Sequence, residues 1–272
     1  MAKSPDCLHK SNNNFRFICC SIFLLMNYIC FAKNTFAQSN KYASIFDPSQ
    51  VLMDVFECEW DAATNMCAWK PRAIDRINMG IDSNGLLYSA IDTVFYQQTK
   101  EGRNAVLVVY TTDMGIAHTS ACNLSLITLK WDDQSGNYFI ESAKKDIALY
   151  GAWGEPGEVY QNRITEMDFL IRVVNSSQSS GHSMSVTSLF YQGANILTYT
   201  SHESNLEFAM DENEMFENNT ELDIDIASRK LTLVTNGKRI EYDDQGNVTP
   251  IFMKNEKTTY EFNGYNLEKV CE

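Results

Sequence analysis

Serine and histidine residues lie close together in the segment 181–185, which reads GHSMS. In the pattern G-x-S-x-G a sharp turn after a strand exposes the serine hydroxyl as a nucleophile, and a histidine base removes its proton. Here the last position is Ser185 instead of glycine, and a β-like run follows where the turn requires a helix. A polar hairpin turn explains the segment without any function. The catalytic hypothesis is a hydrolase with Ser183 as nucleophile and one of three bases: His118, His182 or His202.

An aromatic side chain embedded among glycines is a second candidate site. The segment 151–157 reads GAWGEPG, so Trp153 is flanked by small, flexible residues. Glycine permits close backbone approach, and such a loop can press an indole against a ligand such as a sugar ring. Trp153 and Gly154 are therefore the candidate binding residues. Packing of the indole into one end of a sheet core is the simpler interpretation.

The sequence offers no metal site with a specific spacing, and we expect no metal and no cofactor. The run 211–225 is acidic, but it contains no glycine and does not fit an EF-hand loop, so a solvated acidic face explains it as well as a calcium site does. His118 and Cys122 are four residues apart, yet no C-x₂-C or H-x₃-H pair accompanies them.

The first 37 residues have the pattern of a secretory leader. A basic start precedes the apolar stretch 18–31, and Thr35 and Ala37 are small residues at positions −3 and −1 of a cleavage site after Ala37. A membrane anchor is the alternative, but the stretch is shorter than the roughly 20 residues that a spanning helix needs. We expect residues 1–37 to be a signal peptide, with no membrane span after its cleavage and a periplasmic or secreted mature chain.

Four of the eight cysteines remain after removal of the leader, and an oxidising compartment favours their pairing. Four cysteines allow three connectivities. A short polar loop separates Cys58 from Cys67 and can readily bring them together, which leaves Cys122 to pair with Cys271.

Charge argues against a nucleic-acid partner. The 272 residues include 22 Lys plus Arg and 35 Asp plus Glu, which gives a formal charge of −13, and no basic run occurs. Phosphate binding needs a concentrated basic face.

Period-two hydrophobicity predicts an all-β, mainly antiparallel fold, either a sandwich or an irregular propeller-like meander. A short N-terminal helix is predicted over 47–57, where Asp47 is the N-cap and Pro48 the first helical residue. About a dozen short strands follow, with turns at 100–104, 132–137, 236–237 and 244–247. The acidic, helix-tolerant stretch 203–220 interrupts them. It marks a boundary between a main β domain, 44–202, and a smaller C-terminal β module, 203–272.

Residues 105–157 resemble uncharacterised exported proteins of Gram-negative bacteria. The resemblance lies in the runs VLVVYTT (106–112), LITLKW (126–131) and GAWGE (151–155), with His118 to Cys122 between them. It implies an exported location and a β architecture, and it assigns no functional residue. The combined expectation is an exported, non-catalytic binding or interaction protein of unknown ligand. The alternatives are a secreted hydrolase using Ser183 and a calcium-stabilised surface module.

Overall fold

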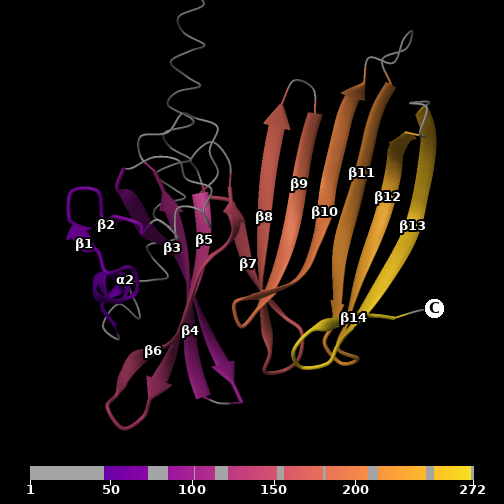
Figure 1. Cartoon of the computed structure of the whole chain (residues 1–272). Coiled ribbons are helices and arrows are strands. Elements are labelled where there is room, and N and C mark those ends of the chain that lie inside the picture. Colours follow the sequence, from indigo (N-terminus) through magenta and orange to yellow (C-terminus); the bar gives the residue numbers. More distant parts are fainter. Residues whose placement is uncertain are drawn as a thin grey trace, which may run out of the picture. The chain divides into compact units, whose positions relative to one another are not determined.

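The computed structural model describes residues 46–72, 85–100, 102–113, 122–151, 156–179, 182–207, 214–242 and 248–270. Within these ranges one short helix precedes fourteen strands, which form a six-stranded and an eight-stranded sheet (Figure 1). Each strand pairs antiparallel with its neighbours in the sequence, in the orders β1 to β6 and β7 to β14. The predicted all-β, mainly antiparallel fold with one short helix is confirmed.

Helix α2, Pro48–Phe56, forms where the sequence predicts it. The Asp47 side chain accepts a hydrogen bond from the Ser49 backbone N–H at 2.9 Å, which caps the first turn. Hydrogen bonds from Ser49 also lower the pKa of the Asp47 carboxyl. The apolar face is buried, and Phe56 packs against Trp69 with ring centroids 5.4 Å apart. The helix thus covers the N-terminal strands of the first sheet.

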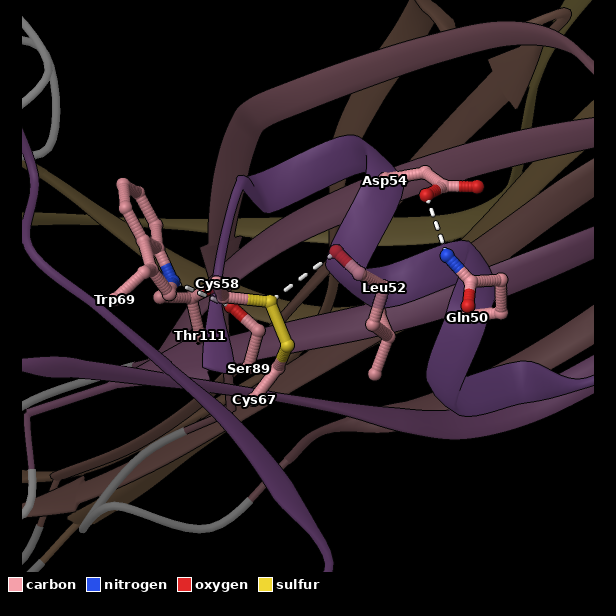
Figure 2. Close-up of a disulfide and its surroundings, with 8 residues drawn as sticks. All are labelled: Gln50, Leu52, Asp54, Cys58, Cys67, Trp69, Ser89 and Thr111. Carbon is pink, nitrogen blue, oxygen red and sulfur yellow. Dashed lines mark hydrogen bonds between the residues drawn. A yellow bond between two sulfur atoms is a disulfide. The ribbon is translucent and has the colours of Figure 1, made fainter. Parts of the chain in front are cut away.

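A disulfide between Cys58 and Cys67 ties the end of this helix to the first hairpin, β1 (Glu59–Asp61) and β2 (Met66–Trp69) (Figure 2). The hairpin lies where the sequence predicts a short polar loop. The predicted pairing of Cys58 with Cys67 is confirmed. Next to it, the Trp69 indole N–H donates to Ser89 Oγ at 2.9 Å, and Ser89 Oγ lies 2.8 Å from Thr111 Oγ1. The indole nitrogen is therefore satisfied although Trp69 is buried.

The body of the first sheet consists of β3 (Leu87–Thr99), β4 (Gly102–Thr112), β5 (Cys122–Asp132) and β6 (Asn137–Tyr150). The central strands are almost continuously buried over 105–109 and 122–127, which is why they read as apolar runs. In β3 a register shift between Ile91 and Thr93 leaves Asp92 as an extra residue. The Tyr150 hydroxyl donates to Asp92 Oδ2 at 2.7 Å, while burial raises the pKa of the Asp92 carboxyl.

The second sheet begins with β7 (Glu158–Arg163), β8 (Phe169–Ser179), β9 (His182–Tyr191) and β10 (Ala194–Glu207). It continues through β11 (Glu214–Asp225), β12 (Lys230–Tyr242), β13 (Val248–Phe262) and the short β14 (Leu267–Lys269).

Two apolar cores hold these strands. The first combines residues of both sheets, with Val106, Val108, Cys122, Leu124, Leu126 and Tyr150 from one and Ile171, Val173 and Phe190 from the other. The second belongs to the eight-stranded sheet and contains Ile164, Leu170, Leu189, Tyr191, Leu231, Leu233, Phe262 and Leu267. Full burial of each large side chain contributes about 1.5–3 kcal/mol, so both clusters are major sources of stability.

The structure differs from the expected elements in the C-terminal half. Asn236 and Gly237 were expected to form a turn, but they lie inside β12 at a register shift, where Gly237 has a φ of +125°. A bulge absorbs the glycine without ending the strand. The stretch 203–220, expected to interrupt the strands, contributes to β10 and β11, because its polar residues pair across strands. The proposed boundary after residue 202 falls inside β10, and the division into two domains stays a prediction.

Candidate functional site

Several residues that the sequence singles out lie outside the described residues. They are His118, Trp153, Gly154, Gly181 and Cys271, together with 211–213 of the acidic run. The proposed binding role of Trp153 and Gly154 and the pairing of Cys122 with Cys271 therefore stay predictions. Cys122 itself is fully buried in the core shared by the two sheets.

Ser183 lies near the start of β9, and the strand runs on to Tyr191. The strand-turn-helix geometry of a nucleophile elbow is therefore not what positions this serine. Its position comes from cross-strand pairing, since Ser183 is opposite Ser204 of β10 and their hydroxyl oxygens lie 2.8 Å apart. The same hydroxyl oxygen lies 3.2 Å from Nε2 of His202.

His202 connects Ser183 to the next strand. Its Nδ1 lies 2.8 Å from Oδ1 of Asn219, which is its register partner on β11, and 3.9 Å from Oε1 of Glu217. In the tautomer whose Nδ1–H donates to Asn219, Nε2 is free to accept the Ser183 proton. A line of serine, histidine and asparagine thus crosses β9, β10 and β11, and it can perform general-base activation of a hydroxyl.

The register explains which histidine faces the serine. His182 is adjacent to Ser183 in sequence, so its side chain points to the opposite face of the sheet, where Nε2 lies 3.4 Å from Oε1 of Glu203. His202 is placed by an irregularity between Thr200 and His202, after which it pairs with Ser185. The structure therefore brings together Ser183 and His202, and it separates Ser183 from His182.

The described part of the acidic run forms a row. Glu217, Glu221, Asp223 and Asp225 all lie at odd-numbered positions of β11, so they share one face of the strand, and all four are exposed. Calcium needs several oxygens that converge on one point. Across the described ranges, no group of three or more His, Cys, Asp or Glu side chains is placed to hold a metal ion.

A cavity of about 490 Å³ lies on a different part of the molecule, where strands β3 to β6 face the segment 167–171 and the β9–β10 turn. Its apolar part is formed by Val106, Leu126, Ile171 and Phe190, all of which are buried. Volumes of about 300–1,000 Å³ are typical of small-molecule sites. The cavity is therefore large enough to hold a small organic ligand.

Asn104 places a buried amide on the cavity wall. The residue is only 9% exposed, and in the described part of the chain its Oδ1 atom has no hydrogen-bond partner. An unpaired polar atom of this kind typically costs about 1–3 kcal/mol. Buried side-chain atoms without a hydrogen-bond partner also occur on Gln161, Asn162 and Arg172, but these residues do not line the cavity. Asn104 thus brings a buried amide whose oxygen is unpaired to the lining of the cavity.

Three further uncharged polar side chains line the same wall, one each from β3, β5 and β6: Gln97, Thr128 and Ser142. They share a face with Asn104, because Gln97 is opposite Asn104, while Thr128 is opposite both Val106 and Ser142. All three are half-buried, and no described residue hydrogen-bonds to their side chains. The wall thus presents a set of uncommitted donors and acceptors.

Charged side chains of both signs surround this wall. Lys100 and Lys144 line the cavity, as do Glu141 and Asp168. Glu141 faces Lys130 at 3.4 Å. Asp168 accepts hydrogen bonds from the hydroxyls of Thr165, at 2.6 Å, and Tyr191, at 3.0 Å. Both acids therefore have partners within the protein, and the charged side chains of the lining are two positive and two negative groups.

Sequence reasoning missed this site because its residues come from six strands and from the segments that connect them, with no local motif. One signal was present. In the alternating series 104, 106 and 108, Asn104 occupies the same face as two buried valines. A polar side chain at an inward-facing position of a strand indicates a buried polar group, which needs a hydrogen-bond partner.

Comparisons of the chain with protein-family models, with curated proteins and with solved structures find no match. The function is therefore inferred from the geometry alone. Among the described residues, no helix has the length and apolar character needed to cross a bilayer.

Proposed function

We propose that the protein is an exported, non-catalytic binding protein whose small-molecule ligand occupies the cavity beside β3 to β6. Export is supported by the leader pattern of residues 1–37 and by the Cys58–Cys67 disulfide, which is compatible with an extracellular location. Binding is supported by a cavity that combines an apolar floor with uncommitted polar groups.

The observation that carries the proposal is the unpaired Asn104 oxygen. A leucine of similar volume would fill the same space without the desolvation penalty, so stability alone does not favour an amide here. A ligand that donates an N–H or O–H to this oxygen would compensate for its burial. The half-buried Gln97, Thr128 and Ser142 side chains extend the same surface.

The test is a screen of the exported protein against a library of soluble fragments that includes amides, amphipathic acids and sugars, followed by NMR of the backbone amides. We expect fragments that shift amides of β4 and β5 around Asn104 and Thr128. Ser142→Phe should block the cavity and abolish these shifts. Ala143→Phe is the matched control, because Ala143 is exposed on the other face of β6.

Loss of the shifts in both phenylalanine variants, or no fragment that perturbs these strands, would overturn the proposal. Retained shifts in Ser142→Phe would place the fragments elsewhere and would overturn it as well.

A second candidate function is ester hydrolysis at Ser183, which the 3.2 Å approach of His202 Nε2 favours. The Asn219 oxygen supports the required histidine tautomer. This site is an open sheet face, on which Asn219 and Glu217 are exposed, so turnover there would be slow and would have broad specificity.

Hydrolysis of p-nitrophenyl acetate distinguishes the two functions. If the Ser183 site is catalytic, Ser183→Ala should abolish turnover, whereas Ser185→Ala should retain it, because Ser185 faces the same side of β9 but bonds to Ser176. Equal turnover in wild type and Ser183→Ala would contradict catalysis at Ser183.

A further inference from the structure

We infer that the ligand of the cavity is a neutral polyhydroxylated molecule, a short oligosaccharide, held by the amides and hydroxyls of Gln97, Asn104, Thr128 and Ser142. This inference rests on the proposed function and adds the chemical class of its ligand. It follows from the kind of groups that the cavity presents and from the way they are arranged.

The polar wall consists of groups that both donate and accept. Amide side chains offer an oxygen acceptor and an NH₂ donor, and hydroxyls offer one donor and two acceptor positions. Sugar hydroxyls have the same dual character, so they can pair with such a wall in several orientations. Asn104 adds a fixed requirement, because its buried oxygen accepts only from a ligand group that carries a hydrogen.

An apolar ligand such as a fatty acid fits the wall poorly. It would displace water from the four polar side chains and would offer them no hydrogen bonds in return. Only the apolar part of the lining, around Leu126 and Phe190, would gain from contact with an alkyl chain. The mixed lining therefore favours a ligand with one polar edge and one apolar face, which is the shape of a pyranose.

The aromatic side of the cavity matches that face. Phe169 lines the cavity and is half-buried, and the Arg163 guanidinium covers its ring, with Cζ 5.3 Å from the ring centroid. Aromatic rings provide a flat apolar wall against which the C–H face of a sugar can pack.

The charges around the cavity balance each other. Lys100 and Lys144 are opposed by Glu141 and Asp168. The whole chain carries a formal charge of −13, which disfavours the approach of anions at low ionic strength. A neutral ligand avoids both the like-charge contact with the two acids and this long-range repulsion.

The experiment applies the exported protein to an array of neutral glycans and measures the affinity of each positive glycan by calorimetry, with sodium dodecanoate as the apolar probe. We expect at least one neutral glycan to bind. Asn104→Leu should weaken its binding about tenfold, which corresponds to the loss of one well-placed hydrogen bond. Ser142→Phe should abolish binding, and Ala143→Phe should leave it unchanged.

If no neutral glycan binds, the assignment of the ligand class is overturned, whatever dodecanoate does. Dodecanoate binding that Ser142→Phe blocks would then show that the cavity binds an apolar ligand, and the proposed function would stand. Glycan binding that is unaffected by both Asn104→Leu and Ser142→Phe would place the glycan elsewhere and would also overturn the inference.

Discussion

Asn104→Leu should have opposite effects on ligand binding and on protein stability. Removal of a buried oxygen that has no partner should stabilise the protein, so Asn104→Leu should raise the free energy of unfolding by about 1 kcal/mol in urea titrations. Asn218→Leu is the matched control. Asn218 is similarly buried, at 8% exposure, but its Nδ2 donates to Glu203 at 3.2 Å, so its replacement should destabilise.

Equal destabilisation by the two substitutions would show that Asn104 is satisfied in the ligand-free protein. The case for a ligand at its oxygen would then be lost.

The buried Asp92 carboxyl predicts a specific pH dependence of stability. Burial raises its pKa above the ordinary aspartate value of 3.8, although the Tyr150 hydroxyl opposes the shift. The folded state therefore binds this proton more tightly than the unfolded state does. The stability that protonation provides is present at pH values below the ordinary range and is lost as the pH rises through the raised pKa.

Relative to wild type, Asp92→Asn should therefore be more stable at pH 8, and the difference should shrink as the pH falls through the raised pKa of Asp92 and become constant below about 4. Thermal unfolding of both proteins across this range is the measurement. Asp223→Asn, at an exposed position of β11, controls for the loss of one surface charge. A constant difference across the range would contradict a raised pKa for Asp92.

The pairing of Ser183 shows what the sequence can and cannot reveal at this scale. The residue types were enough to predict a serine next to a histidine base, but three histidines were possible. Which histidine faces Ser183 depends on the register shift between Thr200 and His202. It also depends on the alternation of side chains along β9, which places His182 on the other face of the sheet. Neither has a local sequence signal.

At the scale of elements, Gly237 is the position where one strand depends most on the absence of a side chain. A Cβ atom added there would lie 2.7 Å from Asn218 Cα and would also overlap the Glu217 carbonyl oxygen. Gly102 is the matched control, because its φ of +123° is nearly the same as the +125° of Gly237, but its surroundings are open.

Gly102→Ala should therefore incur only the backbone strain, about 1–2 kcal/mol, while Gly237→Ala should cost at least about 2 kcal/mol more. Urea unfolding of the two variants measures the difference. Equal losses of unfolding free energy in the two variants would mean that β11 can shift away from the added methyl group without cost.

The disulfide predicts the stability of the N-terminal elements. It closes a separation of nine residues, for which loop-closure entropy corresponds to about 2–3 kcal/mol. Cys58→Ala/Cys67→Ala should lower the free energy of unfolding by this amount in urea titrations without reductant. An unchanged unfolding midpoint in the variant would contradict this role.

Helix α2 was predictable because its signals are local: a capping aspartate, a proline at the first turn and apolar residues at helical spacing. The hairpin β1–β2 was not, because its two strands are short and are held by the disulfide and by Trp69. The dipeptide Asn236-Gly237 was misread for a related reason. It is typical of turns, but the long pairing of β12 with both of its neighbours overrides that preference.

For the whole molecule, the proposed export has consequences that mass spectrometry can measure. We expect exported material to begin at Gln38 and, once unfolded in urea, to have no thiol that reacts with iodoacetamide before reduction, since Cys58 pairs with Cys67 and Cys122 is predicted to pair with Cys271. Intact mass before and after alkylation checks both points. A full-length chain in the membrane fraction, or alkylation at Cys122, would contradict them.

The all-β class could be read from period-two patterns, but the grouping of strands into two sheets could not. That grouping depends on contacts between residues far apart in sequence, such as those that bring Val108 and Phe190 into one core. The cavity could not be predicted for the same reason, since its lining residues are far apart in the sequence, from Gln97 to Gly193.

The strict sequence order of both sheets bears on how the chain would acquire its structure during the proposed export. Within each sheet, every strand after the first pairs with the strand before it in the sequence, so the pairings are local, and low contact order favours rapid folding. A chain that emerges from a translocation channel with its N-terminus first can add strands one at a time. Only the core shared by the two sheets must wait until β8 and β9 have emerged. Folding can therefore keep pace with translocation for most of the length of the molecule.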